Sequence, residues 1–349
     1  MSELKPVPYL HGTPQSSGKL RSQMADFKVF EILPFEPCGE GEHLIIHIEK
    51  TGANTVFVAR QLAKYFGVAE KFVTYAGLKD RFAICQQSFG VHVPGKKNYD
   101  LGDLDIEGVK VLSWQRHNKK LKTGALIGNR FEITLTDVSD VEDVEQRWQK
   151  ICTRGVPNYF GEQRFGIDGG NIARAQYLFE GNKVKDKKKR SIYLSAARSL
   201  IFNQIVAKRI EENMYDVLHA GDVCMLAGTQ SVFLAEEVDD TLLNRLDEKD
   251  IDLTASMWGA GSLMSQGDIA ELEEDVANEN ELFAKGLAKF GLKQERRRIR
   301  LTIAQPKIAV SENQVTVSFF LPSGCFATTV LRELLNYQDM TVRVTKETS

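Results

Sequence analysis

The sequence predicts an α+β protein in which both ends of the chain build one domain and the middle builds another. Strand-like alternation of apolar and polar residues is concentrated in the first 135 residues and again beyond residue 300, whereas helical spacing dominates between them. No regular alternation of strands and helices of the βαβ kind is present. At 349 residues the chain is long enough for two domains. We therefore expect a split α+β domain interrupted by a middle domain.

The N-terminal elements follow from period-two alternation and from turn residues. Alternation predicts strands over 26–32 and 42–48. A helix is expected after Asn54, a favourable N-cap, and Gly67 is well placed to end it. Further strands are predicted at 72–75, 89–93 and 131–135. The strand over 72–75 leads directly to Gly77 and Asp80.

The remaining elements are mostly helical until residue 300. Amphipathic spacing predicts a helix over 141–152, and the Gly- and Pro-containing stretch 155–161 is a plausible domain boundary. A long helix is predicted over 195–212, capped by Ser195, and helices resume over 271–292. Alternation returns at 315–321, and a last helix is expected from about residue 328.

Composition excludes several classes of protein. The five cysteines are odd in number and form no Cys-x-x-Cys pair, so a disulfide framework or a zinc site is not expected, and a reducing cytoplasm is. The chain has no run of 18 apolar residues and no signal-peptide pattern at its N-terminus, so neither a membrane partner nor export is expected.

The charge is unevenly distributed although the formal net charge is only −2. Three basic clusters occur, at 116–122, 183–190 and 296–300, while acidic residues gather at 236–250 and 271–281. Such clusters are a plausible footprint for a nucleic-acid backbone. Each of them is also compatible with a solvated surface. Taken together they favour an RNA or DNA partner.

One carboxylate stands out as a candidate for chemistry. Asp80 lies between Lys79 and Arg81 in a turn that contains Gly77. A carboxylate flanked by fixed positive charge can act as a nucleophile or a base without a metal. The same residues are also typical of a solvated turn. Other motifs are missing: the segment 12–20 departs from a phosphate loop, and no Gly-x-Gly-x-x-Gly, Gly-x-Ser-x-Gly or His-Glu-x-x-His follows a suitable element.

Several blocks of sequence closely resemble the TruD family of tRNA pseudouridine synthases. They run in order through nearly the whole chain: 26–29 (DFKV), 39–43 (GEGEH), 75–80 (YAGLKD), 116–117 (RH), 128–131 (GNRF), 155–166 (GVPNYFGEQRFG), 195–199 (SAARS) and 321–328 (LPSGCFAT). The block 155–166 is the most specific. The resemblance implies a pseudouridine synthase catalytic fold, a mixed and largely antiparallel sheet with flanking helices, formed by residues 1–154 and 304–349. Residues 155–303 are then an inserted α/β domain specific to the family.

The resemblance also implies a reaction and its partners. Uridine in tRNA, expected at position 13, is isomerised to pseudouridine by a catalytic aspartate without cofactor or metal. A bacterial tRNA-Glu-like substrate is expected, and no obligate protein partner is evident. A non-catalytic tRNA-binding or RNA-folding protein on the same scaffold is the alternative. A glycoside hydrolase-like enzyme needs a second carboxylate, for which Glu31 or Glu42 are the candidates, without support from spacing.

The resemblance assigns roles to individual residues. It implies that Asp80 is the catalytic aspartate, which could add to the sugar C1′, add to uracil C6 or remove a C2′ proton. Phe27, Asn129 and Phe326 match positions that contact the substrate nucleotide, the rings as walls and the amide as donor and acceptor. The possible supporting residues are Arg21, as a partner of Asp80, and Phe131, against the base. Lys79 is a further one: neighbours in a strand or turn tend to point apart, so a phosphate contact is the role expected for the residue before Asp80. Core packing is the alternative for each Phe, and a surface position is the alternative for Arg21.

Overall fold

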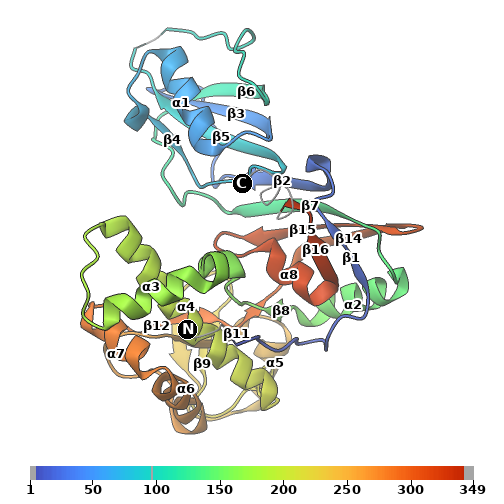
Figure 1. Cartoon of the computed structure of the whole chain (residues 1–349), viewed down its shortest axis with the longest axis vertical. Coiled ribbons are helices and arrows are strands. Elements are labelled where there is room, and N and C mark those ends of the chain that lie inside the picture. Colours follow the sequence, from blue (N-terminus) through green and yellow to red (C-terminus); the bar gives the residue numbers. More distant parts are fainter. Residues whose placement is uncertain (1–4, 96, 342–349) are drawn as a thin grey trace. The chain divides into compact units, whose positions relative to one another are not determined.

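The chain folds into two compact units, each built from separate stretches of sequence (Figure 1). The computed structural model describes residues 5–95 and 97–341. Unit 1 consists of the described part of Met1–Thr13 with Arg154–Thr302 and Thr328–Glu333. Unit 2 consists of the described parts of Pro14–Thr153 and Leu334–Ser349, with Ile303–Ala327.

Unit 2 contains a ten-stranded mixed sheet whose strands come from both ends of the chain. The order along its main path is β14-β15-β7-β2-β5-β3-β6, while β1 pairs with β7 and β16, and β4 pairs with β5. β2 runs parallel to β5 and β1 parallel to β16, and the other described pairs are antiparallel. The strands are β1 (Ser17–Leu20), β2 (Phe27–Ile32), β3 (His43–Thr51), β4 (Val73–Tyr75), β5 (Ile84–His92), β6 (Val109–His117), β7 (Gly128–Thr136), β14 (Ala304–Ser311), β15 (Gln314–Pro322) and β16 (Asn336–Asp339).

The helix α1 (Thr55–Phe66) covers one end of this sheet, where β3, β4 and β5 lie (Figure 1). The Asn54 side chain accepts from Val56 N at 2.8 Å, and Gly67 ends the helix with φ 65°, as the sequence predicted. Val58 and Leu62 of α1 belong to one buried cluster with apolar residues of β3 and β5. That cluster anchors the strands on either side of the loop that carries Asp80.

The helix α2 (Val141–Arg154) packs against another part of the same sheet. Its Trp148 ring lies 5.9 Å from the ring of Phe319 in β15, and Phe319 stacks on Phe131 of β7 at 5.6 Å. Register places Phe131 opposite Val29 of β2. This aromatic layer forms the core beneath the middle of the sheet.

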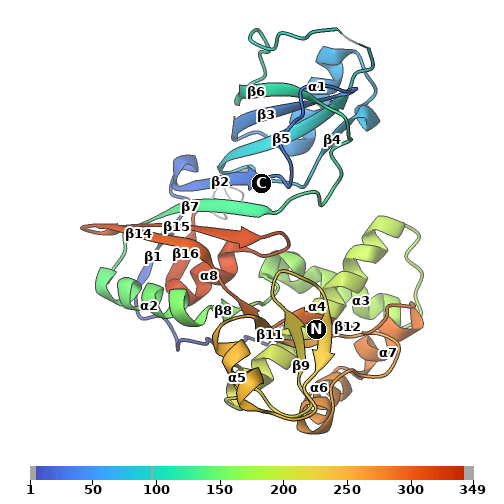
Figure 2. The same cartoon turned by 180° about the vertical axis from the view of Figure 1, so that it is seen from behind.

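Unit 1 combines helices with a four-stranded antiparallel sheet of order β10-β9-β11-β12 (Figure 2). The helix α4 packs on β11 and against α3, α6 and α7. A two-stranded pair, β8 with β13, completes the described strands. The elements are β8 (Val156–Pro157), α3 (Gly170–Phe179), α4 (Lys187–Glu211), β9 (Val223–Leu226), β10 (Val232–Leu234), α5 (Asp240–Asp247), β11 (Ile251–Met257), α6 (Gly267–Glu279), α7 (Glu281–Lys289), β12 (Glu295–Arg298), β13 (Arg300–Leu301) and α8 (Ala327–Leu334), whose Thr328–Glu333 lies in this unit.

The start of α4 differs from the prediction. The helix begins at Lys187 and not near Ser195, because Asp186 is its N-cap and accepts from Lys188 N at 2.8 Å and Lys189 N at 3.1 Å. Residues 187–190 of the basic cluster 183–190 therefore form the first turn of a helix. The predicted helical stretch 271–292 is two helices, with Asn280 between them.

Two observations bear on composition. All five cysteines are free thiols, so no disulfide contributes to the fold. Within residues 5–95 and 97–341, no helix combines the length and the apolar character that crossing a membrane requires.

Candidate active site

Asp80 lies in the loop between β4 and β5, and buried side chains hold the backbone of this loop from three elements. Three hydrogen bonds from side chains leave the backbone of this loop little freedom, since each satisfies a main-chain group away from water. They are Lys50 Nζ of β3 donating to Asp80 O (2.6 Å), Thr55 Oγ1 of α1 accepting from Lys79 N (3.1 Å), and Gln87 Nε2 of β5 donating to Gly77 O (2.6 Å).

The carboxylate of Asp80 faces Arg21 and remains open to substrate. Arg21 Nη2 lies 3.1 Å from Asp80 Oδ2, and Arg21 Nη1 lies 2.7 Å from Asp339 Oδ2. The Asp80 side chain is 46% exposed, whereas that of Arg21 is 7% exposed. The guanidinium lies 4.2 Å from the centre of the Phe27 ring. Arg21 is thus a buried cation that orients an accessible carboxylate, and not a surface residue.

The backbone of Arg21 is in the left-handed region, with φ 60°. For a residue with a Cβ this conformation costs on the order of 1 kcal/mol or more, and it persists where the surroundings impose it. The turn that follows is fixed by Asp26, which accepts from Gln23 N at 2.8 Å. The strained turn between β1 and β2 therefore places the guanidinium between two carboxylates.

Lys79, predicted as a phosphate contact, does not face solvent and lies against two neighbouring side chains. Its Nζ lies 2.6 Å from Asn129 Oδ1 and 3.0 Å from Glu31 Oε2. The side chains of Lys79 and Glu31 are 6% and 0% exposed. The second oxygen, Glu31 Oε1, accepts from Ser88 N at 3.1 Å. Glu31 is consequently the partner of a lysine and not a free second carboxylate of the glycosidase kind.

This buried pair fixes the orientation of Asn129. A lysine ammonium has only donors, so the group of Asn129 that faces Lys79 is its carbonyl. The Nδ2 group has no partner among the described residues, and the side chain is partly exposed. The sequence predicted that the Asn129 amide offers the substrate both a donor and an acceptor. In the structure Lys79 occupies the acceptor, so only the Nδ2 donor is available to a substrate. Such a donor matches the carbonyl oxygens of uracil.

The three predicted rings lie in different environments. Phe27 is 2% exposed and Phe131 is buried as well, with the two rings perpendicular at 6.2 Å. Both belong to the core, and Phe27 also supports Arg21. Phe326 is partly exposed in the turn after β15. Because Ser323 N donates to Ile127 O at 3.0 Å, this turn lies beside the start of β7 and Asn129.

Three residues of this site have roles that sequence reasoning did not predict: Lys50 and Asp339 were missed, and Glu31 was considered only as a second carboxylate of the glycosidase kind. A signal was present for two of them. Glu31 shares the parity of Phe27 and Val29 in β2, and Lys50 that of Ile46 and Ile48 in β3, so alternation puts both charges on a buried face. Burial lowers the pKa of the Lys50 ammonium. No local pattern marks Asp339.

The basic clusters are not equivalent. In the first, Arg116 is structural, with Nη1 donating to Gly41 O at 2.7 Å, and the exposed members are Lys119, Lys120 and Lys122. In the cluster 296–300, which was expected to contribute to a nucleic-acid footprint, three of the four arginines form ion pairs within unit 1. These pairs are Arg296 with Glu273 (2.8 Å), Arg298 with Asp252 (3.1 Å) and Arg300 with Asp252 (3.4 Å).

Comparison with known proteins agrees with the resemblance. The family model "tRNA pseudouridine synthase D (TruD)" matches residues 4–182 and 180–334. The tRNA pseudouridine synthase D of Colwellia psychrerythraea is 62% identical, covering 97% of this chain and 95% of the relative, and that of Aeromonas salmonicida is 47% identical, covering 96% of each. A crystal structure from Methanosarcina mazei, assigned as a tRNA pseudouridine synthase D, has a TM-score of 0.76 at 23% identity, over 94% of this chain and 95% of that one. The chain belongs to the tRNA pseudouridine synthase D (TruD) family.

Proposed function

We propose that this protein isomerises uridine to pseudouridine in tRNA, at position 13, with Asp80 as the catalytic aspartate. Membership of the family supports the reaction. The observation that carries the assignment of Asp80 is its environment: an accessible carboxylate on a loop fixed at three points, 3.1 Å from a buried guanidinium. A fixed cation beside an accessible carboxylate orients it toward a bound substrate.

The chemistry exchanges one bond to the sugar for another. The bond between N1 of uracil and C1′ breaks, the base turns, and a bond forms between C5 and C1′, with C5 losing a proton and N1 gaining one. Asp80 adds to C1′, adds to C6 or removes a C2′ proton in the alternative forms of this reaction. All of them require the detached base to be retained. Asn129 Nδ2 supplies a donor to a uracil carbonyl and Phe326 a partly exposed ring, while Arg21 orients Asp80.

We assign catalysis to residues 1–154 and 304–349 and substrate holding to the inserted residues 155–303. All members of the Asp80 site described above lie in unit 2, which supports this division, although residues 5–13, 154 and 328–333 of the assigned catalytic stretches belong to unit 1. The exposed Lys119, Lys120 and Lys122 are proposed to contact tRNA phosphates. The expected substrate is a tRNA-Glu-like molecule in the cytoplasm, and the proposed reaction uses no cofactor or metal.

The test replaces Asp80 by asparagine, which keeps the shape and removes the charge. We expect Asp80→Asn to lower pseudouridine formation on the order of 10³-fold or more, with tRNA affinity within about twofold of wild type. Carbodiimide labelling of total tRNA, with and without the enzyme, measures both the product and its position. Asp103→Asn, an exposed aspartate of the same unit, is the matched control.

Two results contradict the proposal. A normal rate in Asp80→Asn rules out Asp80 as the catalytic group. If the wild-type protein binds tRNA but forms no pseudouridine in any tRNA, the protein is a non-catalytic RNA-binding member of the family. Product at a position other than 13 corrects the site and leaves the reaction standing.

A further inference from the structure

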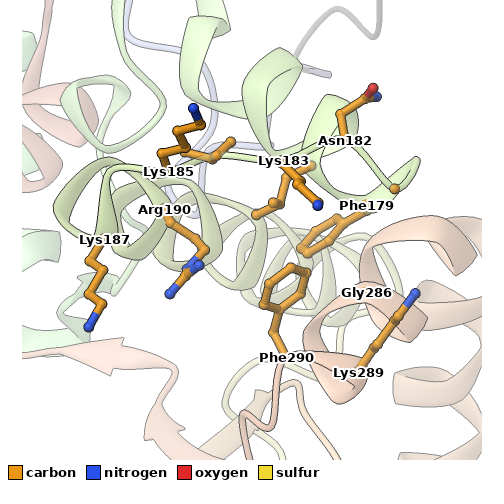
Figure 3. A pocket seen from close by; sticks show the side chains of 12 residues that line it. Phe179, Asn182, Lys183, Lys185, Lys187, Arg190, Gly286, Lys289 and Phe290 are labelled. Carbon is orange, nitrogen blue, oxygen red and sulfur yellow. The ribbon is translucent and has the colours of Figure 1, made fainter.

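Unit 1 has a pocket of about 420 Å³ that lies apart in sequence from every residue of the Asp80 site (Figure 3). The end of α3, the segment that follows it, the first turn of α4 and the end of α7 enclose it. A cavity of this size falls in the range of small-ligand sites, roughly 300–1,000 Å³. Its lining combines cations and aromatic rings.

The charge of the lining residues is entirely positive. Five cations line the pocket and no carboxylate does; they are Lys183, Lys185, Lys187, Arg190 and Lys289. None of the five has a carboxylate within ion-pair distance among the described residues, in contrast to Arg296 and Arg298 of the same unit. Asp186, next to them in sequence, is occupied as the N-cap of α4. Five unneutralised cations around one cavity favour an anionic ligand.

Two phenylalanine rings form an apolar surface at the middle of this pocket (Figure 3). Phe179 and Phe290 lie 5.9 Å apart, and Phe290 is 38% exposed. Phe179 is held against α7, because a Cβ on Gly286 would lie 2.3 Å from the Phe179 ring. The ring of Phe283 supports it from the side at 5.9 Å and 84°. The surface offered by Phe290 is therefore backed by a fixed ring.

We propose that this pocket binds one unpaired nucleotide of the RNA substrate, with the base on Phe290 and the flanking phosphates on the surrounding cations. An exposed ring gives a stacking surface for any base, and lysine and arginine give phosphate contacts. A simple anion leaves the rings unused, and an apolar ligand leaves the cations unused. The inference rests on the proposed function for the identity of the RNA as tRNA.

The experiment measures equilibrium binding of unmodified tRNA at several KCl concentrations. We expect Lys289→Gln to weaken binding about threefold or more and to reduce the slope of log Kd against log salt by about 0.7. Phe290→Leu is expected to weaken binding about fivefold or more without changing the slope. Rates of pseudouridine formation at saturating tRNA stay at the wild-type value in both variants, because neither residue belongs to the Asp80 site.

The matched control is Lys285→Gln. Lys285 is exposed on the same helix one turn earlier, pairs with Glu281 and does not line the pocket. Lys285→Gln removes the same charge from the same unit as Lys289→Gln. If Lys289→Gln and Phe290→Leu bind tRNA with the affinity and salt dependence of Lys285→Gln, the proposal is overturned.

Titration of the protein with UMP distinguishes a free nucleotide from RNA as the ligand of the pocket. Saturable UMP binding that Phe290→Leu abolishes, together with unchanged tRNA affinity in that variant, assigns the pocket to a free nucleotide and overturns the RNA assignment. Absence of pseudouridine in the wild-type reaction overturns the proposed function instead. The binding measurements remain readable in that case, since they need no turnover.

Discussion

Lys79 and Glu31 bury opposite charges directly beside the loop that carries Asp80. Removing two such charges from water is costly, and their attraction offsets this cost only when further hydrogen bonds satisfy them. Here Lys79 Nζ donates to Asn129 Oδ1 and Glu31 Oε1 accepts from Ser88 N, while Glu31 Oε2 has only its ion pair with Lys79. The pair is therefore explained better by what it positions, namely the amide of Asn129, than by net stability.

A double-mutant cycle tests this account at the residue scale. We expect Lys79→Met to destabilise the protein by about 3 kcal/mol, because Glu31 is left as an unpaired buried charge. The variant Glu31→Gln with Lys79→Met is expected to recover a large part of that loss in urea unfolding, yet to form pseudouridine slowly because nothing orients Asn129. If the stability lost in the double variant equals the sum of the losses in Lys79→Met and Glu31→Gln, the two residues are not coupled. Full activity in the double variant would refute the positioning role.

The limits of sequence reasoning are clearest at these residues. Asp80 and Arg21 were singled out before the structure, and the structure brings them within 3.1 Å. For Lys79 the sequence predicts only that it points away from Asp80, whereas its environment is set by Glu31 of β2 and Asn129 of β7. Pairing across a sheet depends on register, which no local pattern specifies.

At the scale of elements, a buried lysine of β3 holds the loop that carries Asp80. Lys50 is fully buried, and its Nζ donates to Ala53 O at 2.9 Å as well as to Asp80 O. The strand and α1 were predicted because alternation and caps are local signals. The start of α4 was not predicted correctly. Asp186 and Ser195 are both acceptable N-caps, and the lysines that follow Asp186 made it look like part of a charged surface segment.

Lys50 gives a prediction about pH. Burial lowers its pKa in the folded state below the ordinary value of the unfolded chain, so between these two values the unfolded chain binds more protons. The stability of wild type relative to Lys50→Met is therefore expected to rise with pH toward about 10, by at most about 1.4 kcal/mol per pH unit. Below the folded-state pKa the penalty is fully present and the difference is constant.

Urea unfolding of both proteins between pH 7 and 10 measures this difference. The effects of titrating groups that do not interact with Lys50 cancel in the comparison, and Cys85→Ala is introduced into both proteins because the Cys85 thiol interacts with Lys50. Lys110→Met, on an exposed position of β6, controls for the loss of a lysine. A wild-type advantage that falls as pH rises would contradict the argument.

At the scale of the whole molecule, each unit depends on distant parts of the chain. Unit 1 is tied to the N-terminal segment by Glu333, which accepts from Leu10 N and His11 N at 3.2 Å each, and by His11 Nε2, 2.8 Å from Gly155 O. The guanidinium of Arg332 lies 3.8 Å from the centre of the Tyr9 ring. The change from strand-like alternation to helical spacing and back predicts an interrupted domain. Contacts between remote segments, by contrast, are visible only in three dimensions.

Deleting residues 1–11 is expected to loosen unit 1 and to spare unit 2. The deletion leaves the buried carboxylate of Glu333 without two of its donors, which costs about 1–3 kcal/mol. Limited proteolysis should then cut first within 154–302. Deleting residues 1–5 is the control, since among the described residues it removes only Lys5 and its exposed pair with Glu279, whose contribution is small. Earliest cleavage within 14–153 would contradict this expectation.

The pairing of β16 with β1 has a consequence for synthesis of the protein. Asp339, at the end of the last described strand, is one of the two carboxylates that hold Arg21. A ribosome makes this strand after both units are otherwise complete, and domains fold as their residues emerge. A nascent chain thus carries Asp80 long before Arg21 gains its second partner. A chain cut before Asp339 is therefore expected to fold extensively and yet to lack the carboxylate that completes the ion pairs of Arg21.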